Sequence, residues 1–282
     1  MALNQAGVAD VSLAAIASED VRKQLSDQAV LINTITNLSA KVGPGMKSIS
    51  IPKVSGMSSN AIPDNGDFST SSGMTLAVDT LQLTSKREVA DYIYDTASDS
   101  AVDLKSAFFE SAPGVFVQDM EARIYAELDG ASAAAPDHIL QMSGASNLVP
   151  TIADIRLAAQ LLDEQKLPLS GRYLAVNPKI KHAIQAFTEV SSAANWGNPD
   201  ALQKGYIGEI YGFKIVMSNQ VTANTMVAYH DSALAFAFQK EITPVQQREE
   251  SKAREFVALR GHYGQKVLDA GKRCILFNAT GA

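Results

Sequence analysis

Apolar and polar residues alternate along two stretches between residues 46 and 93, and a run of turn-forming residues separates them. The first stretch reads MKSISIPKV, the second reads MTLAVDTLQLTSKREVADYI, and the middle reads SGMSSNAIPDNGDFSTSSG. Alternation with a period of two is typical of β-strands. The pattern therefore predicts a long two-stranded hairpin, and the alternative interpretation is a disordered linker between domains.

The expected reach of this hairpin exceeds the size of its own domain. A compact chain of this length has a radius of gyration of about 19 Å, whereas a strand of about 15 residues extends roughly 50 Å. Because an isolated two-stranded ribbon is only marginally stable in water, we expect the hairpin to lie on another surface, most plausibly a neighbouring copy. Its tight turn is expected at Asp64-Asn65-Gly66-Asp67, where Asn-Gly supplies positive φ angles.

Apolar residues spaced three and four apart predict two helices in the first half of the chain. The first helix is capped by Ser18 and ends near Val42. Its apolar positions are Val21, Leu25, Ala29 and Ile32. The second helix follows an interruption at Ala112-Pro113-Gly114, runs from Val115 to Asp129 and stops at Gly130. Its apolar stripe consists of Val117, Met120, Ile124 and Leu128.

An α/β module is predicted from Thr151 onward. Thr151 and Asp154 form the pattern of a capping box at the start of a helix. The sequence GRYLAVNP then predicts a short buried strand, and Asn177-Pro178 begins another helix. The last third, from Gln239 to Phe277, is expected to be rich in strands.

Three glycines, Gly205, Gly208 and Gly212, precede the strand-like run Phe213 to Met217. A dinucleotide-binding loop requires the opposite order, in which a strand comes first and the glycines then open a helix that faces the phosphates. We therefore interpret these glycines as tight turns on the way into a buried strand, and expect no nucleotide to bind there.

Composition and charge narrow the classes of protein. Hydrophobic residues make up 46% of the 282-residue chain, which is enough for a sizeable core. The net charge is −6, from 24 basic and 30 acidic residues, and gives no electrostatic basis for wrapping nucleic acid. The single cysteine, Cys274, is expected to be a small buried residue. The chain lacks an apolar run long enough to span a membrane and a basic signal-peptide start, so we expect it to fold in a cytoplasm.

Residues that could support catalysis or bind a metal are scattered. The four histidines share no ligand spacing, and the sequence contains no nucleophile elbow, phosphate loop or calcium loop. No catalytic residue, metal ligand or cofactor is therefore predicted. Charges of alternating sign concentrate between Arg248 and Glu255. This charged strip is either a solvated edge or a complementary surface where copies of the chain meet.

The order of these parts resembles the major capsid protein of tailed bacteriophages. That family has a flexible arm, a long polar-tipped hairpin, one long helix, an α/β domain and a closing set of strands. The most specific local match is GEIYGFKIVMSNQV followed by MVAYHDSALAFAFQKEI. The resemblance covers nearly the whole chain and implies the α+β capsid fold shared with herpesvirus shells and encapsulins. It places the three glycines in tight turns of the axial domain.

The resemblance also implies a division of the chain. An N-terminal arm spans residues 1–45, the extended hairpin loop 46–93, a peripheral domain with the spine helix 94–150, the axial domain 151–229, and a return to peripheral strands 230–282. The candidate subunit-interface residues are Pro63, Asp64, Asn65, Gly66, Lys86, Arg87, Glu88, Arg248, Glu249, Glu250, Arg254 and Glu255. Some family members join subunits through a Lys and an Asn; Lys53 or Lys86 with Asn278 would be the candidates, although nothing in the sequence supports that reaction.

The function implied by the resemblance is structural. Copies would assemble into pentamers and hexamers of an icosahedral head shell that encloses double-stranded DNA without reading its sequence. The implied partners are scaffolding, portal and decoration proteins, and the implied location is the virion, after assembly in the host cytoplasm. The lack of a large assembly domain before the arm favours a separate scaffolding protein. The alternatives are an encapsulin-type nanocompartment shell and an α/β enzyme with a glycine-rich cofactor loop.

Overall fold

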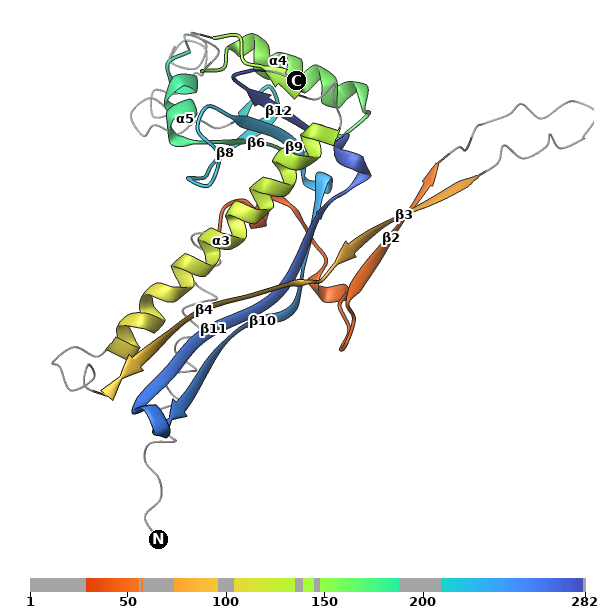
Figure 1. Ribbon diagram of the computed structural model, residues 1–282. Coiled ribbons are helices and arrows are strands. Elements are labelled where there is room, and N and C mark those ends of the chain that lie inside the picture. Colours follow the sequence, from red (N-terminus) through yellow and green to blue (C-terminus); the bar gives the residue numbers. More distant parts are fainter. Residues whose placement is uncertain are drawn as a thin grey trace, which may run out of the picture.

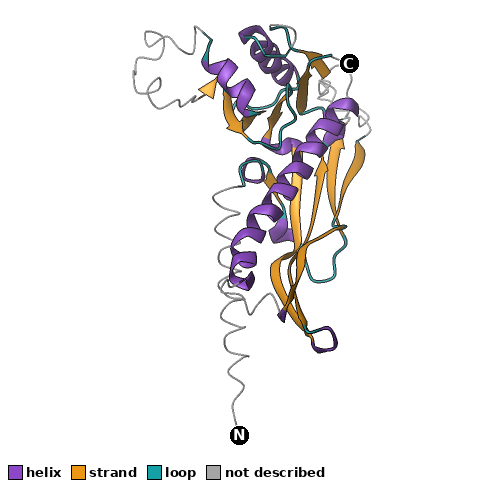
Figure 2. Ribbon diagram, turned by 60° about the vertical axis from the view of Figure 1, so that its left-hand side comes forward, coloured by secondary structure: helices purple, strands orange, loops and turns teal. Residues whose placement is uncertain are grey.

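The computed structural model describes residues 29–55, 57, 74–95, 104–134, 139–144, 148–187 and 209–280, with side chains to residue 130 in the long helix. Within these ranges the chain forms a long four-stranded sheet, a six-stranded sheet, a separate two-stranded sheet and one long helix, α3 (Figure 1). The helix lies along the long sheet and reaches up to the six-stranded sheet, while the two-stranded sheet projects away from both (Figures 1 and 2).

The long sheet has the strand order β1-β10-β11-β4. Its strands are β1 (Thr36–Asn37), β10 (Leu234–Glu249), β11 (Arg254–Val267) and β4 (Ser85–Tyr94). β10 and β11 form an antiparallel hairpin, whose tip is a 3-10 turn over Glu250–Lys252 followed by Ala253 at φ 46°. β4 continues the sheet on the other side of β11, also antiparallel.

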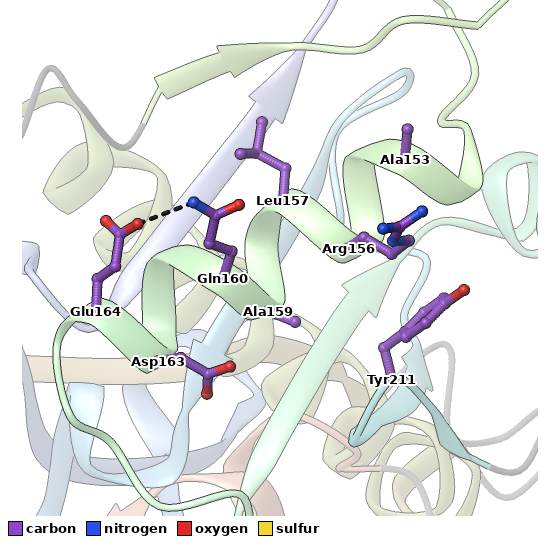
Figure 3. Close-up of a pocket in the computed structure, with 8 residues that line it drawn as sticks. All are labelled: Ala153, Arg156, Leu157, Ala159, Gln160, Asp163, Glu164 and Tyr211. Carbon is purple, nitrogen blue, oxygen red and sulfur yellow. Dashed lines mark hydrogen bonds between the residues drawn. The ribbon is translucent and has the colours of Figure 1, made fainter.

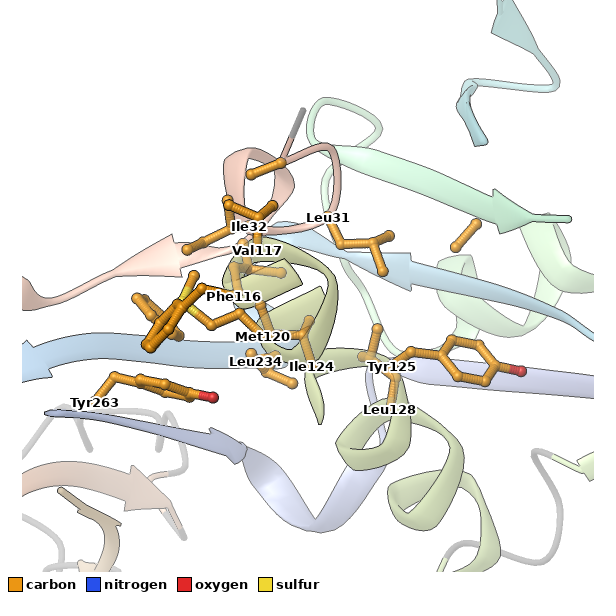
Figure 4. Packing of buried hydrophobic residues seen from close by; sticks show 14 of the residues in the cluster. Leu31, Ile32, Phe116, Val117, Met120, Ile124, Tyr125, Leu128, Leu234 and Tyr263 are labelled. Carbon is orange, nitrogen blue, oxygen red and sulfur yellow. The ribbon is translucent and has the colours of Figure 1, made fainter. Parts of the chain in front are cut away.

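Helix α3 (Leu104–Ala134) packs its apolar stripe against one face of this sheet (Figure 4). The predicted stripe is confirmed: Val117, Met120, Ile124 and Leu128 are all at most 2% exposed. Phe116 extends the contact, because its ring lies edge-on to Tyr263 of β11 with centroids 6.3 Å apart. Burying each large apolar side chain stabilises the fold by about 1.5–3 kcal/mol, so this interface dominates the stability of the module.

The predicted interruption at Ala112-Pro113-Gly114 and the predicted stop at Gly130 are both wrong, since α3 continues through each. Proline removes one backbone donor and crowds the preceding turn, which costs about 3 kcal/mol in an isolated helix. Here Phe109 and Ala112 on one side of Pro113, and Phe116 on the other, are buried in the same core. Tertiary packing on both sides of the proline therefore overrides the local preference.

The six-stranded sheet has the order β5-β12-β9-β6-β8-β7. Its strands are β5 (Ile139–Gln141), β12 (Cys274–Asn278), β9 (Met226–His230), β6 (Arg172–Val176), β8 (Phe213–Met217) and β7 (Glu209–Ile210). Helices α4 (Ile152–Glu164) and α5 (Pro178–Gln185) contribute buried residues to a second core with these strands. We expected the strands from Gln239 to Phe277 to stay together, but β12 lies in this sheet, between β5 and β9.

The helix caps and the buried strand predicted for the α/β module are confirmed. The Thr151 N–H donates to the Asp154 carboxylate at 2.7 Å, which is the side-chain-to-cap bond of a capping box. The Asn177 side chain accepts from the Ile180 N–H at 2.8 Å and so caps α5. The predicted strand GRYLAVNP contains β6, and Cys274 is fully buried.

The two-stranded sheet pairs β2 (Ser48–Ser55) with β3 (Thr75–Gln82) in antiparallel register. The predicted pairing of these two stretches is therefore confirmed, and the linker interpretation is wrong for them. The prediction that the hairpin extends to Ile93 is also wrong, because β4 leaves it and joins β11. Alternation alone cannot tell a strand that pairs within the hairpin, such as β3, from a strand that joins the long sheet, such as β4, since both have one covered and one open face.

The described part of the predicted N-terminal helix is not helical. Residues 29–42 form two short 3-10 turns, Ile32–Thr34 and Ser39–Lys41, on either side of β1, and residues 18–28 lie outside the described ranges. Two tertiary contacts replace the helix. β1 pairs with the start of β10, and the buried carboxylate of Glu121 in α3 accepts from the N–H groups of Val30 and Leu31. Its other oxygen accepts from the Ser218 hydroxyl at 2.9 Å, so one side chain ties the N-terminal segment to both modules.

Replacing Glu121 with alanine should lower the free energy of unfolding of the unassembled chain by about 3 kcal/mol, measured by urea titration. Two backbone N–H groups and a hydroxyl would lose their acceptor, and each unsatisfied buried group costs roughly 1–3 kcal/mol. Gln118→Ala, at an exposed position of the same helix, is the control and should change the value by less than about 0.5 kcal/mol. Equal effects of the two substitutions would contradict this role of Glu121.

Candidate assembly surfaces

One face of the β2-β3 hairpin is apolar and uncovered. Val54 lies opposite Leu76, and Pro52 lies opposite Val78, so these four side chains share a face. Met74 lies two residues before Leu76 and precedes β3. Val54, Leu76, Val78 and Met74 are between 44% and 65% exposed. Several large apolar side chains exposed side by side mark a surface that another molecule covers. We call Pro52, Val54, Met74, Leu76 and Val78 together the hairpin face.

The opposite face of the hairpin is held at its base by the long sheet. Ile49 and Leu81 are cross-strand partners, and they form a small core with Leu83 and with Ala235 and Ala237 of β10. The base of the hairpin is therefore fixed by apolar packing, whereas the apolar face of its outer half is uncovered.

Gly264 of β11 permits this base to approach the sheet. A Cβ atom at this position would lie 2.2 Å from the backbone oxygen of Gln82, which is closer than any real contact. Sequence reasoning missed this residue, because the glycine lies inside a strand and its neighbour is distant in sequence. A glycine within a strand pattern is the only signal that could have indicated a close approach of backbone.

The long sheet has one covered face and one partly open face. Along β11, Val257, Leu259 and Tyr263 belong to the core shared with α3. The alternate residues face the other way, and there the hairpin base covers only the end near Gly264.

At the far end of the open face lies a cluster of aromatic rings and guanidinium groups. Tyr92 and Phe256 are cross-strand partners with ring centroids 5.2 Å apart. The Arg254 guanidinium stacks 3.7 Å from the Tyr92 ring centroid, and Arg260 lies 5.5 Å from that of Phe256. Tyr92 and Tyr94 are 40% and 49% exposed. We call these residues, Tyr92, Tyr94, Arg254, Phe256 and Arg260, the aromatic face.

The charged strip from Arg248 to Glu255 is largely paired within the chain. Arg248 makes two bonds to the Asp95 carboxylate, at 2.5 and 2.6 Å, and Arg254 pairs with Glu249 at 2.8 Å. These bonds lower the pKa of Asp95 and of Glu249 below their ordinary values. Glu250 bonds Arg248 at 3.2 Å and is the most exposed acid of the strip.

Other candidate interface residues have different surroundings. Glu255 turns toward α3, where it pairs with Lys105, and its side chain is only 12% exposed. Arg87 approaches Asp119 of α3 at 3.9 Å, whereas Glu88 bonds Arg260 at 2.7 Å on the open face, where Lys86 lies opposite His262. Pro63, Asp64, Asn65 and Gly66 lie outside the described residues.

Of the three glycines that we interpreted as turns, only Gly212 lies in the described ranges. Tyr211 at φ 49° and Gly212 at φ 80° form the two-residue turn that joins β7 to β8. Positive φ at both positions is the geometry of a tight hairpin, which agrees with the predicted role. In β8, Phe213 is fully buried, but Met217 is 40% exposed and is not the core residue that we expected.

A surface hollow lies between α4 and the Tyr211 turn (Figure 3). Its lining mixes small, apolar and charged side chains: Ala153, Arg156, Leu157, Ala159, Gln160, Asp163, Glu164 and Tyr211. Asp163 is already paired with the buried Arg172 at 2.6 Å, and Gln160 bonds Glu164 at 3.0 Å. The described residues contain no group of three or more potential metal ligands, and none of their helices could cross a membrane.

Comparison with known proteins agrees with this architecture. A family model described as phage capsid protein matches residues 78–276. A solved structure from Mycobacterium phage Che8 is similar over 90% of this chain and 92% of that chain, with 20% identity and a TM-score of 0.73. The capsid structure of cyanophage P-SCSP1u covers 89% of this chain and 88% of its own, with 17% identity and a TM-score of 0.72. No curated protein matches the chain.

A more distant similarity is to a virus-like particle. The crystal structure of a virus-like particle from Pyrococcus furiosus covers 93% of this chain and 97% of its own, with 11% identity and a TM-score of 0.58. These identities show a shared fold, whereas the family match spans most of the chain and favours the phage form. The predicted fold class is therefore confirmed, and the chain belongs to the phage capsid protein family, as a shell-forming structural protein with the fold of tailed-phage heads.

Proposed function

We propose that copies of this chain assemble into the pentamers and hexamers of an icosahedral head through the hairpin face of one copy and the aromatic face of its neighbour. The observation that carries the proposal is the outer half of the hairpin, which exposes Val54, Leu76 and Val78. A free two-stranded ribbon is marginally stable, and apolar surface of this kind favours burial at about 25 cal/mol per Å². Another copy of the chain is a partner that is always present, and it supplies one receiving surface for each hairpin.

The aromatic face is suited to receive the hairpin face. Tyrosine, phenylalanine and arginine are the residues most enriched at the centres of protein interfaces. The hairpin face is uncharged, so docking would not bury an unpaired charge. Arg254 and Arg260 already have acidic partners, Glu249 and Glu88, and would enter the interface with their charges compensated.

We further propose how the parts of the chain divide between shell domains. The long sheet and α3 would form the peripheral domain, and the six-stranded sheet, including β5 and β12, would form the axial domain. The shell would enclose double-stranded DNA without contacting specific bases, which is consistent with the net charge of −6. Scaffolding, portal and decoration proteins would be the partners, assembly would take place in the host cytoplasm, and the role would be structural rather than enzymatic.

Leu76→Asp should leave the unassembled chain folded but prevent closed shells. The side chain is 60% exposed, so its own fold loses little, whereas docking would bury an unpaired carboxylate in an apolar contact. Thr75→Asp is the matched control, since it adds the same charge to the other side of the same strand, at another exposed position. Light scattering and negative-stain images should show shells for Thr75→Asp and none for Leu76→Asp. Normal shells from Leu76→Asp would show that the hairpin face is not an interface.

A mixing experiment tests the receiving surface. Tyr92→Asp should also fail to form shells, although its hairpin is intact. A mixture of Tyr92→Asp and Leu76→Asp chains retains one productive contact per pair, from the intact hairpin of the first chain to the intact aromatic face of the second. Sedimentation should then detect a species of two chains that neither variant forms alone. If the mixture stays monomeric well above the concentration at which the wild type assembles, the receiving surface lies elsewhere.

A further inference from the structure

One of the turns that join the two large sheets has an unusual backbone. Asp269, Ala270 and Gly271, between β11 and β12, have φ angles of 58°, 52° and 79°. Residues other than glycine avoid this left-handed region, because the Cβ atom crowds the following carbonyl oxygen. Aspartate tolerates this region better than most residues, so the strain lies mainly at Ala270, and strain of this kind persists only where the surroundings impose it.

Both strands of the hairpin contact this turn. Lys53 of β2 forms an ion pair with the Asp269 carboxylate. Asp79 of β3 accepts from the Asp269 N–H at 3.0 Å. Arg273, at the start of the six-stranded sheet, approaches the second carboxylate oxygen at 3.4 Å. The Asp269 side chain is only 16% exposed, so these contacts are partly shielded from water.

Asp269 therefore connects three parts of the chain. It contacts the hairpin through Lys53 and Asp79, it follows β11 of the long sheet, and it contacts Arg273, which directly precedes β12 of the six-stranded sheet. The apolar core at the hairpin base contains Ile49, Leu81 and Leu83, and Leu268 packs against it immediately before the strained turn. The outer half of the hairpin has no other ion pair to the body among the described residues. Its direction thus depends on the base core and on contacts with a single residue, Asp269.

We propose that the Asp269–Gly271 turn is a latch that fixes the direction of the hairpin in the free chain. The Lys53–Asp269 ion pair and the Asp79 hydrogen bond hold the turn in its left-handed conformation, and the strained backbone favours release when these contacts break. Release would let the hairpin change its angle together with the connection between the two sheets. This is a property of the single chain, and it holds whichever surface of a neighbour receives the hairpin.

The test measures the direction of the hairpin in the full, unassembled chain. Nitroxide labels at Thr75→Cys in β3 and Gln118→Cys in α3 report one distance by pulsed electron resonance, and the native Cys274 is fully buried. The otherwise unaltered chain should give a single narrow distance. Lys53→Gln should add a second population, whereas Lys47→Gln should not, because Lys47 is an exposed lysine of the same segment with no ion pair in the described structure. An unchanged narrow distance in Lys53→Gln would overturn the proposal.

Two further variants separate a latch from a general loss of folding. Asp269→Asn keeps a residue that tolerates positive φ but removes the charge, so it should add the same second population as Lys53→Gln. The double variant should show no further change in this population, because both substitutions remove the same Lys53–Asp269 ion pair, and the Arg273 contact that Asp269→Asn also weakens does not involve the hairpin. Ala270→Gly should raise the melting temperature and keep the single distance, since glycine relieves the strain without touching the ion pair. Additive effects in the double variant, or a lower melting temperature for Ala270→Gly, would contradict the latch.

Discussion

The apolar face of the outer half of the β2-β3 hairpin has no apolar partner among the described residues of its own chain, although Lys53 on the opposite face pairs with Asp269. A two-stranded ribbon cannot supply a core, because each strand has a partner on only one side. The chain therefore fixes the ribbon at one end, through the small core around Ile49 and Leu81 and the close approach at Gly264. The apolar face beyond that base needs a second molecule to cover it, which is what a shell subunit provides to its neighbours.

The residues that stabilise the fold are consequently different from the residues that we propose to mediate assembly. The stripe of α3 against the long sheet and the core of the six-stranded sheet contain nearly all of the large buried side chains. The buried carboxylate of Glu121 connects these modules to the N-terminal segment. Because the exposed hairpin face contributes little to the buried cores that stabilise the fold, substitutions there can change association without unfolding the chain. Such a separation suits a protein that must first fold alone and then join many weak, identical contacts.

The sequence predicts elements whose signals are local. The capping residues Thr151 and Asn177 and the stripe around Met120 depend on side chains a few positions apart, and the structure contains all of them. The failures involve partners distant in the chain. Pro113 stays helical because neighbouring residues are buried against another element, and β4 joins β11 rather than β3 because alternation does not identify a partner.

The same limit applies to the candidate interface residues. Arg248 and Arg254 look free in the sequence, but their acidic partners include Asp95, which is 153 residues away from Arg248. Pairing of this kind cannot be deduced from charge alternation. The aromatic face was missed for a similar reason, since Tyr92 and Phe256 meet only through the register of β4 and β11. The pairing of the hairpin was predictable, because its alternation is regular, but its described strands have eight residues each rather than the expected length of about 15.

Hydrogen exchange of the hairpin amides, compared between the free chain and assembled shells, shows whether a neighbouring copy covers the outer half of the hairpin. Amides in residues 48–51 and 79–82, near the base, should exchange slowly in both states. Amides of residues 53–55 and 75–78, in the outer half, should exchange rapidly in the free chain and become protected in the shell, because only a neighbour covers them. Equal and rapid exchange of the outer half in both states would show that no neighbour covers the hairpin and would contradict the account.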